Sequence, residues 1–280
     1  MPDTAALDRL RRVRGFVLDM DGTLVMGDRN NQGMVALPGA ASLLESLADR
    51  GTGFCIYTNG TVKTPDQIAE VLQGIGLPVA PDQALTPAST AVDVFLERGH
   101  RRVMVLGGKG ITEPLEAAGI ETVPPLRGTP CDAVMAGWFR QELTFDALEA
   151  AVFAVFDGAP MYSASQSLFF ATAEGRSLGT SRAISAVVRD ITGREATVVG
   201  KPSAAALRTA GRRLGLAPEE LSVVGDDPEL EVPMAHGSGA FAVAVHTGIG
   251  HAESFSDLPA DRRPHLDLAD VGVLAELLRG

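Results

Sequence analysis

Short apolar runs alternate with segments of helical periodicity along nearly the whole chain, and this alternation restricts the fold more than any other feature. Runs of strand length lie at 16–18, 54–57, 103–106, 133–136, 197–199, 221–224 and 240–245. Apolar residues recur at helical spacing after Pro38 and near 65–73, 88–96, 112–118, 145–157, 182–190 and 204–214. Such alternation is typical of a parallel sheet covered by helices. We therefore predict an α/β fold with a doubly wound, Rossmann-like sheet.

Composition and charge narrow the class of protein. Of the 280 residues, 45% are hydrophobic, which is enough for a buried core. The net charge of −11 argues against non-specific attraction to nucleic acid or to an anionic membrane. The apolar stretch 147–156 is too short for a membrane span, and the polar residues up to Arg14 do not resemble a signal peptide. Cys55 and Cys131 lie in apolar runs, as expected of reduced, buried thiols in a cytoplasmic protein.

Two carboxylates, Asp19 and Asp21, stand where the first predicted strand ends, and Gly22 follows them. Ligands of α/β sheets bind at the carboxyl ends of strands. Because the backbone turns there, Asp19 can face a substrate while Asp21 bends back over it, so that the two flank one phosphorus atom. The alternative is an Asx-type turn that closes the strand, since Asp-Gly is common in such turns. The pair alone favours neither interpretation.

Two later strand ends carry groups that suit a phosphate. Thr58, Asn59 and Gly60 follow the second predicted strand and offer a hydroxyl and backbone N–H groups. Lys201 follows a strand and precedes Pro202 and a predicted helix. Its ammonium can therefore neutralise a carboxylate and a phosphoryl oxygen together, although most loop lysines are only solvated.

A fourth strand end is acidic. Asp226 and Asp227 follow the run 221–224, and Glu229 and Glu231 lie just beyond. Such oxygens suit Mg²⁺, which prefers one or two carboxylates together with water and substrate phosphate. Acids at a helix N-terminus are the competing explanation for the two glutamates. Four strand ends that all offer phosphate or metal chemistry are hard to explain by packing.

Four motifs carry a resemblance to a known family: Asp19-Met20-Asp21-Gly22-Thr23, Thr58-Asn59, Gly200-Lys201-Pro202 and Gly225-Asp226. In this order they resemble the haloacid dehalogenase-like phosphatases. The long interval between the second and third motifs resembles the interval in the branch whose members carry a large inserted cap. That branch includes para-nitrophenyl, phosphoglycolate and pyridoxal phosphatases. The resemblance implies an α/β cap domain, which we place at 101–188 between core segments 1–100 and 189–280.

The resemblance also implies roles for individual residues. Asp19 would be the nucleophile and a metal ligand, and Asp21 the general acid and base that also binds Mg²⁺ through its backbone carbonyl. Asp226 would be the further metal ligand. The groups that would bind the phosphoryl group are those of Thr58, Asn59, Gly60 and Lys201.

Two positions depart from the family's pattern. Gly60 stands where many relatives have a second asparagine, so one polar contact is expected to be missing. Glu231 stands five residues after Asp226, where the family commonly has aspartate, and its carboxylate reaches one methylene further. We expect aspartate to be tolerated at this position unless the loop has adjusted to the longer side chain.

Within the predicted cap, Trp138 and Arg140 are candidates for substrate contact, as is the polar stretch 163–166. Ordinary cap surface or core is the alternative for each. The segment Gly107-Gly108-Lys109-Gly110 lacks Walker spacing and is interpreted as a cap turn. By resemblance, a homodimer through the cap is plausible.

The expected activity is Mg²⁺-dependent hydrolysis of a small phosphorylated metabolite through an aspartyl-phosphate on Asp19. A phosphotransferase that uses a second hydroxyl acceptor is an alternative, as is a catalytically weak protein that only binds phospho-ligands. The intact set of Asp19, Asp21 and Lys201 argues against a pure binder, and the acidic loop argues against a dehalogenase. The substrate stays open among sugar phosphates, phosphoglycolate, nucleotides and pyridoxal phosphate.

Overall fold

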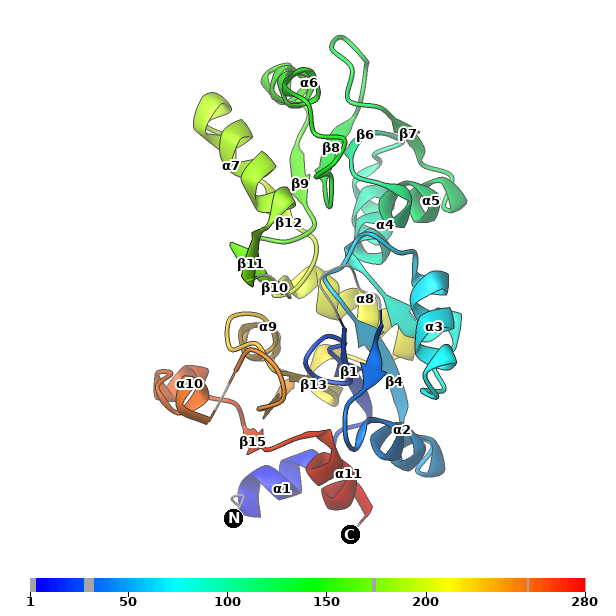
Figure 1. Ribbon diagram of the computed structural model, residues 1–280, viewed down its shortest axis with the longest axis vertical. Helices are drawn as coiled ribbons and strands as arrows, with labels where there is room; N and C mark the ends of the chain where they lie inside the picture. The colour runs from blue at the N-terminus through cyan, green and yellow to red at the C-terminus, as the bar shows by residue number, and fades with distance from the viewer. Residues whose placement is uncertain (1–3, 28–32, 173–174, 251, 280) are drawn as a thin grey trace. The chain divides into compact units, whose positions relative to one another are not determined.

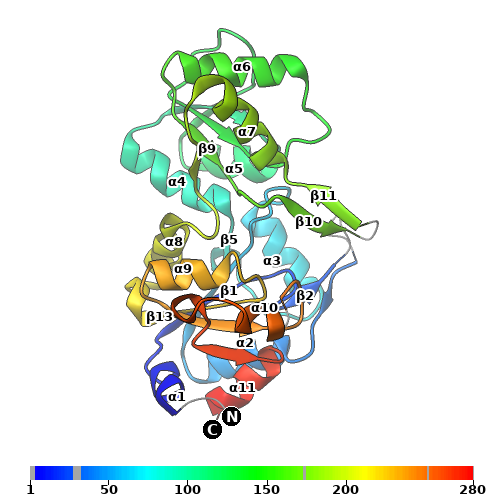
Figure 2. The same cartoon turned by 90° about the vertical axis from the view of Figure 1, so that its left-hand side faces the viewer.

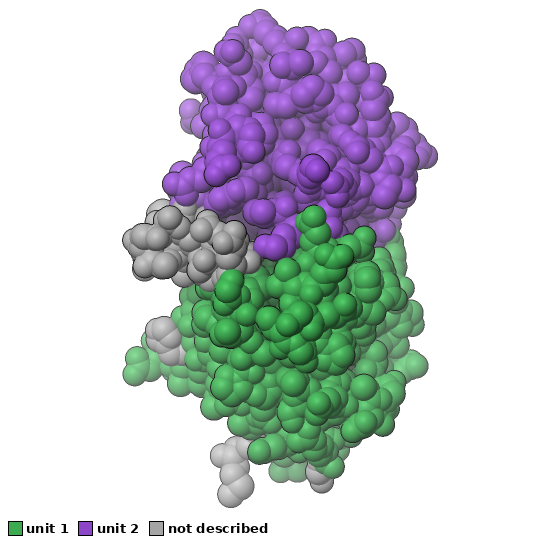
Figure 3. All heavy atoms as spheres, turned by 45° about the vertical axis from the view of Figure 1, so that its right-hand side comes forward, with its two compact units in different colours: residues 1–58, 66–85, 201–280 green, residues 59–65, 86–200 purple. Residues whose placement is uncertain are grey.

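The protein folds into two compact units, each built on a parallel sheet (Figure 3). The computed structural model describes residues 4–27, 33–172, 175–250 and 252–279. The first unit comprises Met1–Thr58, Asp66–Leu85 and Lys201–Gly280, and the second comprises Asn59–Pro65 and Thr86–Gly200. Each unit combines helices with a main sheet of parallel strands, so the predicted α/β class is confirmed.

A six-stranded parallel sheet forms the centre of the first unit, with strand order β15-β14-β13-β1-β4-β5 (Figure 1). The strands are β1 (Gly15–Leu18), β4 (Gly53–Tyr57), β5 (Ala84–Leu85), β13 (Leu221–Gly225), β14 (Phe241–Val245) and β15 (Leu266–Leu268). Val17 of β1 pairs with Val223 on one side and with Cys55 on the other. Segments from both ends of the chain therefore form one sheet, and their carboxyl ends meet at one edge.

Alternate side chains of β1 enter two separate cores. Phe16 and Leu18 pack against α2, α3 and α11, whereas Val17 packs against α8 and α9. Because both faces are covered, the strands are apolar throughout, as the sequence pattern indicated. The helices of this unit are α1 (Thr4–Leu10), α2 (Ala40–Asp49), α3 (Pro65–Gly74), α8 (Ala204–Leu214), α9 (Glu231–Gly237), α10 (Ala252–Ser256) and α11 (Val271–Arg279). A short antiparallel ribbon joins β2 (Val25–Met26) and β3 (Val35–Ala36).

Local signals fix the start and end of α8, the helix that follows Lys201. Ser203 is its N-cap, and the Ser203 hydroxyl accepts a hydrogen bond from the Ala206 N–H at 3.1 Å. Gly215 ends the helix with a φ of 67°, a conformation that glycine adopts without steric cost. The lysine is therefore carried on a short, well-anchored segment.

The second unit has a five-stranded parallel sheet of order β12-β9-β8-β6-β7 and a separate hairpin of β10 and β11. Met104, Val134 and Met161 on one face of the sheet share a core with residues of α6 and α7. Figure 2 shows these two helices near β9. The strands are β6 (Arg102–Leu106), β7 (Glu121–Val123), β8 (Ala133–Ala136), β9 (Met161–Ser163), β10 (Phe169–Thr172), β11 (Gly175–Leu178) and β12 (Thr197–Val198). The helices are α4 (Pro87–Arg98), α5 (Lys109–Ala117), α6 (Phe145–Phe156) and α7 (Thr180–Thr192).

The second unit is wider than the cap predicted at 101–188. Helix α4, which we had assigned to the core, packs beside α5, and its Phe95 ring lies edge-on to Tyr162 of β9 at 4.8 Å between centroids. Strand β12 pairs with β9 and not with the first sheet. These contacts place both elements in the second unit.

Three smaller features also differ from expectation or add to it. The segment 107–110 was interpreted as a turn, but α5 already begins at Lys109. Cys55 is buried as expected, whereas Cys131 is only half-buried. Within the described ranges, no helix is both long enough and apolar enough to cross a membrane.

Candidate active site

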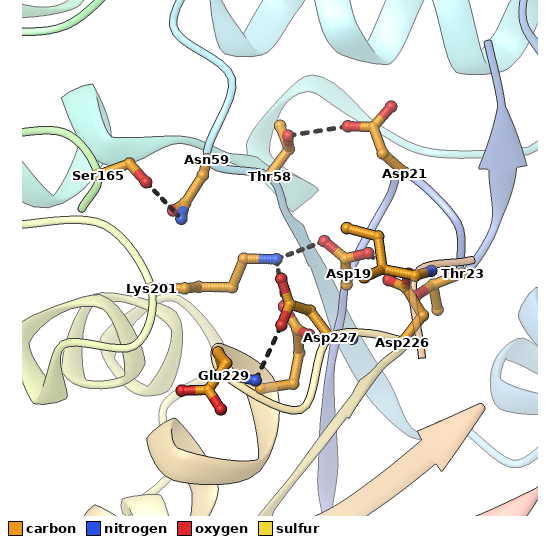
Figure 4. A network of polar contacts seen from close by, with 12 residues as sticks. Asp19, Asp21, Thr23, Thr58, Asn59, Ser165, Lys201, Asp226, Asp227 and Glu229 are labelled. Carbon is orange, nitrogen blue, oxygen red and sulfur yellow. Dashed lines mark hydrogen bonds and ion pairs between the residues drawn. The ribbon is translucent and has the colours of Figure 1, made fainter. Parts of the chain in front are cut away.

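Asp19 directly follows β1 at the centre of the first sheet, and two side chains hold its carboxylate (Figure 4). The Thr23 hydroxyl donates to Asp19 Oδ2 at 2.9 Å. The Lys201 ammonium forms a short ion pair with Asp19 Oδ1. Asp19 is 7% exposed and Lys201 is 2% exposed, so this pair is almost entirely removed from water. Both oxygens of the carboxylate therefore have fixed directions.

Lys201 has a second carboxylate partner in Glu231. Lys201 Nζ lies 2.7 Å from Glu231 Oε1, and Glu231 Oε2 accepts a hydrogen bond from the Asp227 N–H at 3.0 Å. Burial by itself lowers the pKa of Lys201, but Asp19 and Glu231 outweigh it and raise that pKa above its ordinary value. Lys201 therefore stays positively charged at neutral pH.

Asp226 follows β13 and lies beside Asp19. Its Oδ2 accepts a hydrogen bond from the Ile249 N–H at 2.5 Å, and its Oδ1 lies 3.4 Å from the Thr23 hydroxyl. Burial, and then the negative charge of Asp19, raise the pKa of Asp226 to about 7. Since Thr23 contacts both aspartates, the two carboxylates share one small polar space. The sequence motif contained Thr23, but no role had been assigned to it.

Asp21 and Thr58 are joined across two neighbouring strands. The Thr58 hydroxyl donates to Asp21 Oδ2 at 3.2 Å. Thr58 is 3% exposed, whereas the Asp21 side chain is exposed. An exposed carboxyl group that is oriented by a hydrogen bond can exchange a proton with a substrate or with water.

The charges in this network suit a divalent cation. Three buried carboxylates, those of Asp19, Asp226 and Glu231, lie around the buried ammonium of Lys201. Among the described residues, no three His, Cys, Asp or Glu side chains form a ready-made metal-binding group. Mg²⁺ does not require one, because it binds one or two carboxylates and fills its other positions with water and phosphate. The donor set therefore fits Mg²⁺.

The other predicted site residues lie in the second unit. The Asn59 amide donates to Ser165 Oγ at 3.5 Å (Figure 4), and the Trp138 N–H donates to Thr61 Oγ1 at 2.9 Å. Gly60 belongs to the same segment as Asn59, and Arg140 is exposed. The structure thus gathers Asp19, Asp21, Thr58, Lys201 and Asp226 in the first unit, while substrate contact by the second-unit residues stays a prediction.

The sequence motifs predicted no site residue at the end of β14. Thr247 donates a hydrogen bond to the Gly22 carbonyl at 2.5 Å, and Ile249 contacts Asp226 as described above. The strand-end rule could have indicated these residues, because ligands gather at the carboxyl ends of parallel strands and β14 adjoins β13. A Thr-Gly pair at such a position resembles an ordinary turn.

Carboxylates and a threonine at the ends of β1, β4 and β13, together with Lys201, are the kinds of group that a hydrolase of the phosphoryl-transfer type uses. The model of the haloacid dehalogenase-like hydrolases matches residues 16–121, and a second model for the same kind of hydrolase matches 198–273. The two matches contain every site residue described in the first unit. The chain belongs to the haloacid dehalogenase-like hydrolase family.

Curated relatives and solved structures resemble the chain over most of its length. A 5'-nucleotidase of Bacillus subtilis is 26% identical over 89% of this chain and 93% of its own. An acid sugar phosphatase of Staphylococcus aureus is 26% identical over 87% and 90%, respectively. The crystal structure of a 4-nitrophenylphosphatase from Thermotoga maritima superposes with a TM-score of 0.85 at 24% identity, covering 97% of this chain and 98% of that one. The fold of that structure is therefore shared over nearly the whole of this chain.

Proposed function

We propose that this protein is a Mg²⁺-dependent phosphatase of small phosphomonoesters that uses Asp19 as its nucleophile. The observation that carries the proposal is the position of the Asp19 carboxylate, held between the Thr23 hydroxyl and the buried Lys201 ammonium at the end of β1. A protein that only binds phosphate does not need an oriented carboxylate beside a lysine. The names of the curated relatives support phosphomonoesters as the substrate class.

In the first step, an oxygen of Asp19 attacks the phosphorus atom and forms a new P–O bond. The bond from phosphorus to the ester oxygen breaks, and Asp21 gives its proton to that oxygen as the alcohol leaves. Lys201 offsets the negative charge of the phosphoryl oxygens, and Thr58 fixes the direction of Asp21. The product of this step is an aspartyl-phosphate.

In the second step, water attacks the same phosphorus atom, and the bond to Asp19 breaks. Asp21, which is now ionised, takes the proton of the attacking water. Inorganic phosphate leaves, and both carboxyl groups return to their starting states. The exposure of Asp21 supports this double role, because the group must meet both a substrate and water.

The Mg²⁺ ion would be held by the side chains of Asp19 and Asp226 and by the backbone carbonyl of Asp21. When bound, it supplies positive charge that stabilises the transferring phosphoryl group. The burial of Asp226 beside the Asp19 carboxylate supports this assignment, since a bound cation would offset two buried negative charges.

The test measures phosphate release from para-nitrophenyl phosphate, nucleoside monophosphates, sugar phosphates, phosphoglycolate and pyridoxal phosphate. We expect release that depends on Mg²⁺ and is lost in Asp19→Asn without loss of fold. Glu229→Gln is the matched control, because it removes an exposed charge from the acidic loop and should leave the rate near that of the wild type. Full activity in excess EDTA contradicts the metal assignment. Transfer of phosphate to an added alcohol, in place of release, identifies a phosphotransferase.

A further inference from the structure

The loop that follows β14, residues 246–250, closes on the acidic residue Asp226. The Ile249 N–H donates to Asp226 Oδ2 at 2.5 Å, and the Gly250 N–H donates to the Asp226 backbone carbonyl at 2.9 Å. From the same loop, the Thr247 hydroxyl donates to the Gly22 carbonyl at 2.5 Å. One loop therefore holds both the acid at the end of β13 and the turn that follows Asp21.

Gly248 makes this contact possible because it has no side chain. A Cβ atom at Gly248 would lie 2.0 Å from Asp226 Oδ2 and 2.8 Å from Gly22 Cα. The φ angle of Gly248 lies outside the left-handed region, so alanine could adopt the same backbone conformation. The close approach to Asp226, and not the backbone, requires glycine here.

The loop also decides which oxygen of Asp226 remains for a ligand. Oδ2 is engaged by Ile249 and enclosed by two glycines, since a Cβ at Gly22 would also lie 2.6 Å from it. Oδ1 points to the Thr23 side, where the Asp19 carboxylate lies. Asp226 is thus fixed in an orientation that offers one oxygen to the shared space.

We propose that Thr247, Gly248 and Ile249 are positioning residues that lock Asp226 so that it presents Oδ1 alone to Mg²⁺. This inference rests on the proposed function, because it concerns the same metal site. None of the three residues needs to touch the metal or the substrate. Partners that orient a metal ligand typically affect metal affinity or activity by about 10 to 100-fold when they are removed.

Gly248→Ala is the direct test, and Mg²⁺ binding to the substrate-free protein by calorimetry is the main measurement. We expect a loss of Mg²⁺ affinity of roughly 10 to 100-fold and a similar rise in the Mg²⁺ concentration for half-maximal activity. At saturating Mg²⁺ the turnover rate should largely recover. Gly237→Ala is the matched control, because Gly237 lies in the same unit, is not in the left-handed region and has no neighbour within 4 Å of an added Cβ. It should bind Mg²⁺ as the wild type does.

A second pair of variants keeps the test decisive if Gly248→Ala does not fold. Thr247→Val removes the hydrogen bond to Gly22, and Thr247→Ser keeps the hydroxyl. We expect weaker Mg²⁺ binding in the valine variant and recovery in the serine variant. A lower unfolding temperature with unchanged Mg²⁺ affinity in Gly248→Ala or Thr247→Val means that the loop is only structural, and it overturns the inference. If the wild type itself binds no Mg²⁺, both the proposed Mg²⁺-dependent function and this inference about the loop are contradicted.

Discussion

Glu231 reaches across Gly225 to Lys201, with 2.7 Å between Glu231 Oε1 and Lys201 Nζ. Both residues are 2% exposed. A Cβ atom at Gly225 would lie 2.1 Å from Glu231 Cγ, so Gly225 leaves the space that the Glu231 side chain fills. The tolerance of aspartate at position 231 stays a prediction.

We predict that Glu231→Asp lowers the free energy of unfolding by about 1 to 3 kcal/mol. The shorter side chain cannot keep both the Lys201 contact and the hydrogen bond from Asp227, and a buried polar group that loses its partner costs this much. Urea denaturation measures the change. Gly225→Ala should also destabilise the protein, because the added methyl group would overlap the Glu231 side chain. An unchanged free energy of unfolding in Glu231→Asp would show that the protein does not need the longer side chain for these two contacts.

The Asp21→Asn variant tests the acid role of Asp21. We expect the rate to fall by about 10² to 10⁴-fold for alkyl phosphates, because a poor leaving group needs the proton. Aryl phosphates with acidic leaving groups should lose less. The measurement is kcat/KM over a series of leaving groups of graded pKa. Equal losses across the series would remove Asp21 from this role.

The lowered pKa of His265 in the folded protein predicts that stability depends on pH. Burial, and then Arg9 and His236, lower the pKa of His265 to about 4. The Ala242 N–H donates to His265 Nδ1 at 2.8 Å, so this nitrogen carries no proton in the folded state. In the unfolded chain a histidine titrates near pH 6.5.

The unfolded state therefore binds the proton more readily than the folded state does. The stability contributed by neutral His265 should be complete above about pH 6.5, fall as the pH drops towards 4, and level off below that. Denaturation at a series of pH values measures this slope. His265→Asn keeps an acceptor near Nδ1 but does not titrate, so its stability should change less over the same range. An identical slope in both proteins would exclude His265 as the cause.

The cap residues Trp138 and Arg140 are tested by their alanine variants. We expect the ratio of kcat/KM between large metabolites and para-nitrophenyl phosphate to change by about tenfold, since pocket contacts are worth 1 to 3 kcal/mol. The hydrogen bond of Trp138 to Thr61 uses the main chain and survives the substitution. Arg194→Ala, at another exposed position of the same unit, is the control. Unchanged ratios would leave both residues as ordinary surface.

Much of the fold and the central site could be predicted because one rule governs both. Buried parallel strands are apolar runs, and their carboxyl ends meet at one edge, so Asp19, Thr58 and Asp226 could be placed together without knowing the pairing. Asp21 and Lys201 follow strands or turns near that edge, and hydrogen bonds join them to the same network.

Pairing partners and loop contacts could not be predicted in this way. The run that contains β12 is as apolar as the others, and nothing in it tells that β9 is its neighbour. Thr23 and Thr247 are small polar residues near turns, where the residue type usually matters little to the structure. Their importance depends on distances between segments that are far apart in the sequence.

The central place of β1 in the first sheet matters for how the chain is made. Strand β1 leaves the ribosome before β13, which pairs with it from Gly15 to Leu18 and follows only after the second unit has been synthesised. Until then one edge of β1 has no partner from β13, and such edges promote aggregation. Lys201 and Asp226 also follow the second unit, so a nascent chain cannot acquire the reaction centre before β13 and Asp226 emerge. Premature termination before β13 should therefore yield an inactive, aggregation-prone fragment instead of a weaker enzyme.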